Sequence, residues 1–270
     1  MANTYILSGI TSQFETYNHG AQLDPSKRYE ASLLSLDMYN SIPNIIDEKN
    51  NAFEYSVDSG NTWKIITIDT GAYELSAINN EIQRKMIAEG DFDSNNSSCY
   101  ITITANESRG TSIINVTNTN YQVAFNATHS IRSVLGFNAT DLLNHGYNES
   151  PNKVDIMHIN SILVNINIIS GSYVKGTSSS SIHSFYPKVG FGYKIIETPN
   201  PALIWYPVST TDISRMELTL TDQDGKPINT GGERLTVRIC VREVRETREV
   251  QNIQNGIIQA IKYLKKEKIL

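Results

Sequence analysis

The chain has 270 residues, of which 39% are hydrophobic and 19% are charged, and its formal net charge is −5. This length can bury a full core, and all-β sandwiches often reach it as one domain. The charge content is low for a solvated helical protein and suits sheets whose outer faces carry Asn, Ser and Thr. The start lacks a signal peptide, and no apolar run is long enough to span a bilayer. We therefore expect a soluble protein that is not secreted and is made in a reducing compartment.

The charge is unevenly distributed along the chain. From Arg234 to the end there are nine Lys or Arg and four Asp or Glu, about +5, which leaves the first 233 residues near −10. The basic end is therefore a candidate contact for nucleic acid or for an acidic partner. The alternative is that these basic residues bind no partner and only form the solvent-facing side of a helix.

The first part of the chain predicts strands. Residues 1–28 are polar and are predicted to form an arm or an edge strand. Residues 29–39 alternate apolar and polar side chains, as a strand with one buried face does. Residues 53–57 alternate in the same way, residues 58–61 read Asp-Ser-Gly-Asn, and residues 63–68 run back, which predicts a hairpin.

Residues 73–88 form the one internal helix that the sequence predicts with a clear apolar stripe, and Gly90 follows them. A helix inserted between strands of a sandwich covers an open edge or end of a sheet, which also blocks unwanted pairing. The predicted stripe consists of Leu75, Ile78, Ile82, Met86 and Ile87.

The later part of the chain again reads as short strands. In residues 156–174, Ile162, Val164, Ile166 and Ile168 share one side of a two-residue repeat, which predicts a core strand. Further strands are predicted at residues 99–104, 111–117, 121–125, 184–186, 193–197, 203–206, 215–221 and 234–241, with one helical turn at 130–135 and surface loops at 138–153 and 175–181. Asp222-Gln223-Asp224-Gly225 is predicted to turn a hairpin between the last two strands.

No motif for catalysis or metal binding stands out. The five histidines are scattered, and no phosphate loop, nucleophile elbow or Cys/His pair occurs. Asp91, Asp93 and Asn95 resemble the first ligands of a calcium loop, but the expected later Gly and Glu are absent, so a polar loop is the better interpretation. Cys99 and Cys240 fall in predicted strands, and the sequence leaves their pairing open. We predict that the protein is not an enzyme and needs no cofactor.

The C-terminal segment, residues 246–268, is a candidate amphipathic helix. Three alternatives remain for it: packing on the chain's own sheet, docking to another copy or a different protein, and lying at a membrane interface. The residues predicted to bind a partner are Ile253, Ile257, Ile261 and Leu264. Those predicted to contact an anion are Lys262, Lys265, Lys266 and Lys268.

Several short motifs occur in an order that resembles a known family. They are Tyr73-Glu74-Leu75 with Ile78-Asn79 and Glu81-Ile82-Gln83, then Leu135-Gly136-Phe137, Asn160-Ser161-Ile162, Gly171-Ser172-Tyr173, Tyr186-Pro187, Pro207-Val208, residues 220–225 and residues 235–239. With these motifs the chain resembles, over roughly residues 30–243, the minor capsid proteins of Polinton (Maverick) elements and adintoviruses. The segment after Arg245 is not part of the pattern.

The resemblance implies a single jelly-roll penton protein. Such a protein forms pentamers at the fivefold vertices of an icosahedral capsid, beside a double jelly-roll major capsid protein, and it has no catalytic residues to carry over. It would lie in the virion capsid and be made in the host cytoplasm or nucleus.

The overall prediction is an all-β fold: a single jelly-roll β-sandwich with one inserted α-helix and a C-terminal helical tail. Its predicted parts are an arm at residues 1–28, a jelly-roll domain at 29–244 and the basic helix at 245–270. The alternative function is a carbohydrate-binding, lectin-like sandwich that presents Tyr and Asn. A hydrolase on the same scaffold would need clustered carboxylates, which the sequence does not display.

Overall fold

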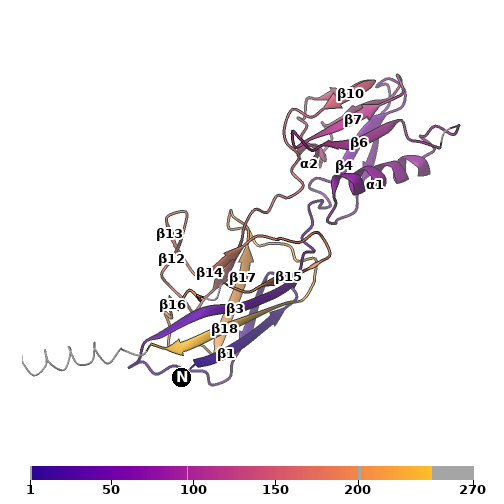
Figure 1. Ribbon diagram of the computed structural model, residues 1–270. Helices are drawn as coiled ribbons and strands as arrows, with labels where there is room; N and C mark the ends of the chain where they lie inside the picture. Colours follow the sequence, from indigo (N-terminus) through magenta and orange to yellow (C-terminus); the bar gives the residue numbers. More distant parts are fainter. Residues whose placement is uncertain (1, 96, 200–201, 245–270) are drawn as a thin grey trace, which may run out of the picture.

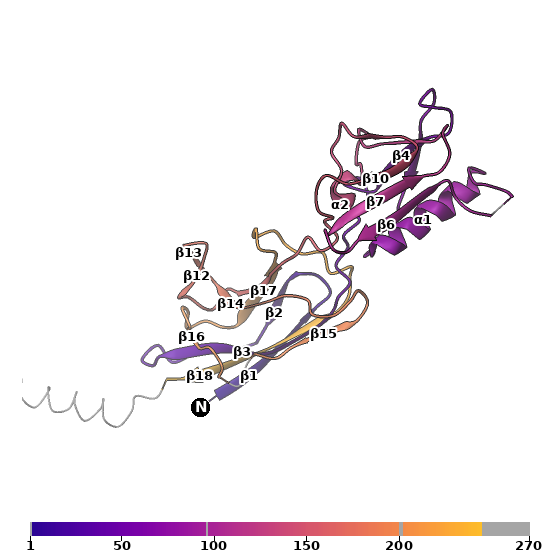
Figure 2. The same cartoon turned by 45° about the horizontal axis from the view of Figure 1, so that its top comes forward.

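The structure is a computed structural model that describes residues 2–95, 97–199 and 202–244. It contains two bodies joined by two short linkers, as Figures 1 and 2 show. Each body has its own cluster of buried hydrophobic side chains, and the two clusters share no residue. We call residues 2–42 and 159–244 the jelly-roll body, and residues 43–158 the inserted body.

The jelly-roll body consists of two antiparallel sheets. The first sheet has the order β1 (Ala2–Gly9), β18 (Leu235–Glu243), β3 (Tyr29–Tyr39), β15 (Lys194–Glu197), and β16 (Tyr206–Pro207) also pairs with β3. The second sheet has the order β14 (Ser181–Phe185), β11 (Ile162–Ile166), β17 (Arg215–Thr221), β2 (Gln13–Tyr17). A hairpin of β12 (Ser172–Val174) and β13 (Thr177–Ser179) forms a separate two-stranded sheet between β11 and β14 in the chain. Among the other strands of this body, successive strands lie in opposite sheets, except that β11 and β14 are neighbours in one sheet and β15 and β16 both pair with β3. This is the jelly-roll arrangement that the sequence predicted.

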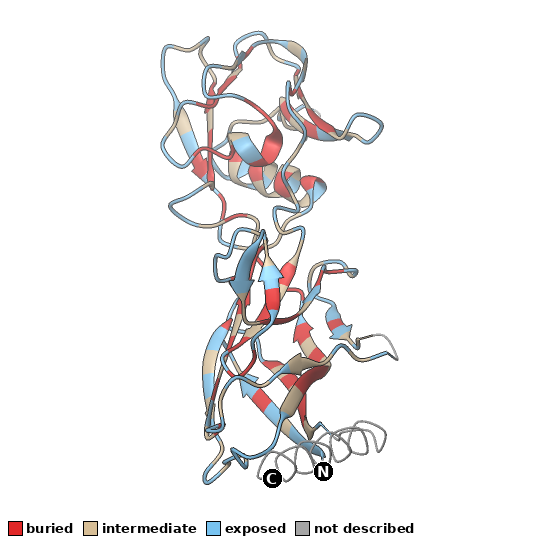
Figure 3. Ribbon diagram, turned by 90° about the vertical axis from the view of Figure 1, so that its left-hand side faces the viewer, coloured by how far each residue is buried: buried red, intermediate tan, exposed pale blue. Residues whose placement is uncertain are grey.

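The core of the jelly-roll body follows from the two-residue repeat of its strands. Leu36 and Val237 of the first sheet are fully buried, as are Val164 and Leu218 of the second. The residues between them along each strand point outward and are more polar, so buried positions alternate with partly exposed ones in β11 and β17. Figure 3 shows the same burial classes along the strands. The sequence pattern therefore assigns the inner face of each sheet.

The inserted body lies between β3 and β11 in the chain. One sheet has the order β5 (Lys64–Thr67), β4 (Ala52–Ser56), β8 (Gln122–Ala124), β9 (Leu142–Leu143), and the other β10 (Gly146–Glu149), β7 (Thr111–Val116), β6 (Ile101–Asn106). Helix α1 (Leu75–Ala88) packs on β6 and β5, and α2 (Arg132–Leu135) is a single turn. The predicted stripe of α1 is buried at Leu75, Ile78, Ile82 and Met86, whereas Ile87 is 46% exposed.

The domain division differs from the predicted one. A single domain was expected over residues 29–244, but residues 45–143 enclose a separate core. Alternation along a strand identifies its buried face and not the core to which that face belongs, because strand partners are distant in sequence. At the other end, the predicted arm at residues 1–28 contains β1 and β2, one at the edge of each sheet. The edge-strand alternative is therefore the correct one.

The turn after β17 also differs from its prediction. Asp222-Gln223-Asp224-Gly225 does form a tight turn, in which the Asp222 carboxylate accepts hydrogen bonds from the backbone N–H groups of Asp224 and Lys226. It does not join two paired strands, however, since β17 lies in the second sheet and β18 in the first. The prediction of a hairpin was wrong because the same turn chemistry serves a crossing between sheets. The other predicted hairpin is confirmed by the antiparallel pairing of β4 and β5.

The turn of the β4–β5 hairpin leads to a pH prediction. The Thr62 side-chain and backbone donors, with the Ser56 hydroxyl, lower the pKa of Asp58 to about 2. A pKa below the unfolded value of about 3.9 means that ionised Asp58 stabilises the fold above that pH, and that this stabilisation disappears as the pH falls toward about 2. We expect Asp58→Asn to lower the free energy of unfolding at pH 7, with a difference from the unchanged protein that shrinks below about pH 4. Urea unfolding across this range measures it, and a pH-independent difference would contradict the assignment.

Candidate assembly surfaces

The outer face of the first jelly-roll sheet carries charged side chains in pairs between exposed aliphatic ones. Arg238 of β18 donates to Asp37 of β3 at 2.9 Å and to Ser35 at 2.8 Å. Arg242 bonds to Glu30 at 2.5 Å. Both pairs are half-exposed, so each contributes about 1 kcal/mol at most to stability. Their clearer effect is to fix the guanidinium groups in place on this face.

Two isoleucines stand at the edges of the same face. Ile6 of β1 is 61% exposed and lies directly opposite Arg238 in the register. Ile196 of β15 is 62% exposed and lies opposite Asp37. No described residue covers either side chain, so the face offers apolar area next to charges that already have partners.

The outer face of the second sheet is different in chemistry. Arg215 of β17 pairs with Glu15 of β2 and lies 3.7 Å from Glu217. The Arg215 guanidinium, followed by the Tyr17 hydroxyl, lowers the pKa of Glu15. Asn165 of β11 donates to the Thr221 hydroxyl at 3.1 Å. This face is therefore polar throughout, whereas the first sheet combines ion pairs with exposed aliphatic side chains.

A groove lies beside β14, which pairs only with β11 among the described strands. β12 (Ser172–Val174), which pairs with β13 (Thr177–Ser179), forms one wall, and Ile204 and Tyr206 form another. Close to it, His183 of β14 contacts Glu197 of β15 at 3.1 Å, and both side chains are less than one-fifth exposed. This contact links the two sheets at their open edge.

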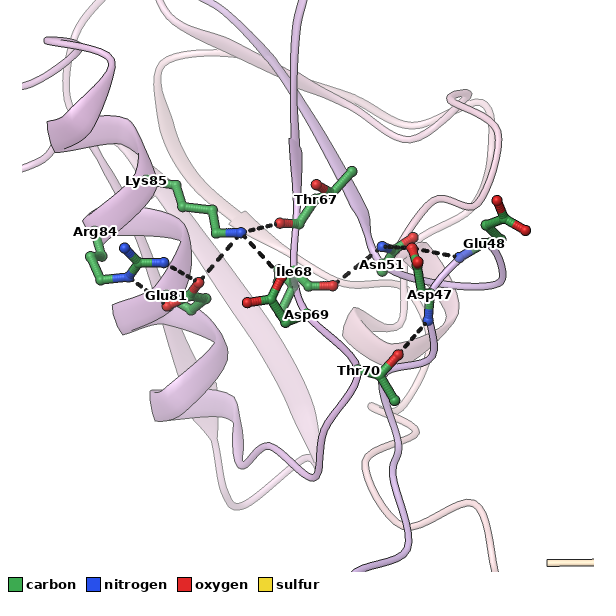
Figure 4. Close-up of polar contacts among 10 residues, drawn as sticks. All are labelled: Asp47, Glu48, Asn51, Thr67, Ile68, Asp69, Thr70, Glu81, Arg84 and Lys85. Atoms are coloured by element: carbon green, nitrogen blue, oxygen red, sulfur yellow. Dashed lines mark hydrogen bonds and ion pairs between the residues drawn. The ribbon is translucent and has the colours of Figure 1, made fainter. Parts of the chain in front are cut away.

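A cluster of charged side chains lies between α1 and β5 in the inserted body, as Figure 4 shows. Lys85 donates to the Thr67 backbone carbonyl at 2.5 Å and lies 3.6 Å from Glu81 and 3.7 Å from Asp69. Glu81 also accepts two hydrogen bonds from Arg84, which lower its pKa. Because these charges neutralise one another, the cluster attaches the helix to the neighbouring strand and offers no free charge of one sign.

The linkers between the two bodies are held by side-chain amides. Asn44 donates to the backbone carbonyls of Tyr73 at 2.7 Å and Ile156 at 3.1 Å, so it ties the outgoing linker to the returning one. Gln223, in the turn after β17, bonds to the His158 carbonyl and the Asn160 N–H. These contacts anchor the returning linker on the jelly-roll body.

The residues predicted as functional sites have three outcomes. The partner-binding and anion-contact residues of the tail all lie outside the described residues, so they stay predictions. Asp91 of the acidic loop accepts hydrogen bonds from Tyr55 and Lys64, both at 2.6 Å, and its carboxylate belongs to the body's internal packing. Burial, and then this bond to Asp91, raise the pKa of Tyr55. Cys99 and Cys240 are free thiols.

Metal-binding clusters and membrane-spanning helices are both absent from the part of the chain that the structure describes. Its residues contain no group of three or more His, Cys, Asp or Glu that could hold a metal ion. They also contain no helix that is long and apolar enough to cross a membrane.

The exposed Ile6 and Ile196 were not predicted from the sequence as surface sites. An apolar residue on the outer face of a strand interrupts the apolar–polar alternation at one position only, which is too weak a signal to identify it.

Comparison with known proteins finds similarity at the level of structure. No protein-family model matches the chain, and no curated protein matches it. Among solved structures, the chain is similar to the crystal structure of selenomethionine-labelled mavirus penton protein. The sequence identity is 11% and the TM-score is 0.46, and the match covers 90% of this chain and 100% of that chain.

Proposed function

We propose that this chain is a viral capsid protein that forms homopentameric vertices of an icosahedral shell and has no catalytic role. The observation that carries the proposal is the jelly roll: two packed antiparallel sheets whose outer faces include the exposed Ile6 and Ile196 of the first sheet and Arg215 of the second. Jelly rolls serve as viral capsid domains, lectins and cupins. The ordered motifs that resemble the minor capsid proteins of Polinton elements and adintoviruses favour the capsid role.

The two outer faces suit a ring. A closed ring of identical copies needs two different complementary surfaces on each copy. Here one face carries exposed Ile6 and Ile196 beside the Arg238–Asp37 pair, and the other carries Arg215 with Glu15 and Glu217 among hydroxyl and amide groups. In the proposed ring, the first face of one copy meets the second face of the next. Such a contact would be partly polar and wet, as interfaces that are not obligate generally are.

The proposed partners follow from the same role. They are four further copies of the chain, a double jelly-roll major capsid protein around the vertex, and a nucleic acid or acidic protein that the basic tail would contact. The inserted body lies at one end of the jelly-roll body, and the start of β1 and the end of β18 lie at the other (Figure 1). This polarity suits a vertex in which the basic end points inward and the inserted body outward. The protein would then reside in the virion, after synthesis in the host cytoplasm or nucleus.

The mass of the purified protein in solution tests the proposal. Light scattering coupled to size exclusion should give about five times 30.2 kDa, with fivefold rings in negative-stain images. A monomer that also stays monomeric with a major capsid protein present, and that binds sugars on a glycan array, would overturn the proposal in favour of the lectin-like alternative.

A further inference from the structure

The groove beside β14 presents exposed surface, about half of it apolar and half polar, that no described residue covers. It has a volume of about 550 Å³, and two of its lining side chains, Tyr173 and Ile204, are 74% and 63% exposed. Its apolar lining consists of Leu163, Tyr173, Val174, Ile182, Ile204 and Tyr206. Exposed apolar side chains that line a concave surface often form a binding site, whereas a single exposed apolar residue on a flat surface generally does not.

The chain leaves the jelly-roll body close to this groove. β18 ends at Glu243, and the next residue, Val244, donates its N–H to the Arg28 carbonyl at 2.9 Å. Just before this point, the Arg242 guanidinium lies 3.5 Å from the centre of the Trp205 ring. Trp205 stands in the chain between Ile204 and Tyr206, which both line the groove. The end of β18 therefore contacts the segment that also supplies Ile204 and Tyr206 to the groove.

Twenty-six residues, 245–270, follow this exit point and lie outside the described residues. Their sequence places Ile253, Ile257, Ile261 and Leu264 three or four positions apart, which is the spacing of side chains that enter a groove from one helix face. A segment that begins beside a groove also reaches it at a high effective concentration, because the covalent link replaces a bimolecular encounter. The apolar side chains of the groove thus suit the stripe, and the tail begins close to them.

We propose that, in the free subunit, residues 245–270 dock their apolar stripe into this groove of the same chain. The proposal goes beyond the vertex function, since it needs no second copy and no capsid. In this proposal the groove covers the apolar stripe of the tail in the free subunit. When the tail leaves the groove, the stripe becomes available to a partner. Of the three alternatives that the sequence left open for the tail, this one is packing on the chain's own jelly roll.

A photo-cross-linker in the groove tests the docking in the full chain. p-Benzoylphenylalanine replaces Tyr173 in one protein and Tyr147 in a control, because Tyr147 is 82% exposed but lies in β10 of the inserted body. Irradiation of an equal mixture of light and isotope-heavy chains, followed by mass spectrometry, shows which peptides are joined. We expect position 173 to join peptides of residues 245–270 within one isotopic chain, at least about tenfold more often than position 147 does.

Two variants of the tail sharpen the test. Ile257→Asp with Ile261→Asp places charges on the stripe and should lower the cross-linking from position 173 by about tenfold or more. Asn255→Asp with Gln259→Asp adds the same charge on the opposite helix face and should leave the cross-linking yield from position 173 unchanged. Equal yields from positions 173 and 147 would overturn the proposal. Joined light and heavy chains as the main product would also overturn it, because the tail would then dock on a neighbouring copy.

Discussion

Ile82→Asp is expected to unfold the inserted body while the jelly-roll body stays folded. Ile82 lies in the middle of α1, is 0% exposed, and belongs to the separate core of the inserted body. A carboxylate without a partner in such a core costs several kcal/mol or forces the group to take up a proton. Because whole domains are stable by only about 5–15 kcal/mol, this one change removes much of the body's stability.

Hydrogen exchange followed by mass spectrometry measures the effect body by body. Amides of β4, β6, β7 and α1 should lose their protection, and those of β3, β11 and β17 should keep it. Ile87→Asp is the matched control, since it makes the same change on the same helix at a side chain that is 46% exposed. Loss of protection in both bodies would contradict the prediction, and the two cores would then form one cooperative unit.

The separation of the two cores explains how much of this fold the sequence could reveal. The strand at Tyr29–Tyr39 and the helix that ends at Ala88 occur within two residues of their predicted bounds, because one-sided burial imposes a period that is visible along the chain. The assignment of each strand to a sheet is not visible in this way. It depends on pairs such as β1 with β18, whose residues are more than 200 positions apart.

Residues 156–174 show that the same limit applies within a single predicted strand, because its partners are not visible in the local sequence. The prediction of a core strand was correct for Ile162–Ile166, and Ile168 is buried as the alternation required. The strand nevertheless ends at Ile166, because Ile169 bridges to Val208 and the chain turns into the β12–β13 hairpin. The first residues of the predicted stretch, before Ile162, belong to the linker that returns from the inserted body. A period of two predicts the buried face well, but the length of a strand depends on partners elsewhere in the chain.

The candidate surfaces were harder to predict than the core. Alternation identifies the outer residues of a strand, yet it does not say which outer faces remain uncovered once the chain has folded. Arg238, Asp37 and Ile6 share a face only because β1, β18 and β3 are neighbours in the first sheet. The groove is formed in the same way, by Tyr173 and Tyr206 from distant segments. The tail, in contrast, shows its stripe directly in the sequence, because a helix face is a local property.

Ile6→Asp combined with Ile196→Lys is expected to convert the proposed pentamer into a folded monomer. Both side chains are more than 60% exposed in the single chain, so the changes remove little core packing. Each new charge also faces an opposite one across the strand pair, because position 6 lies opposite Arg238 and position 196 lies opposite Asp37, which favours the free subunit. In the ring, the same positions would be buried between copies. Each buried isoleucine contributes about 1.5–3 kcal/mol there, and the variant replaces both with charges that must lose their water.

The measurement is light scattering at a protein concentration at which the unchanged chain is pentameric, together with thermal unfolding of both proteins. The expected result is a monomer mass with a similar melting temperature. Ile65→Lys is the matched control, because Ile65 is 57% exposed, lies opposite Glu54 and belongs to the outer face of a sheet in the inserted body. A variant that remains pentameric would show that the ring closes through other surfaces. If the Ile65→Lys control alone became monomeric, the inserted bodies and not the jelly rolls would hold the ring together.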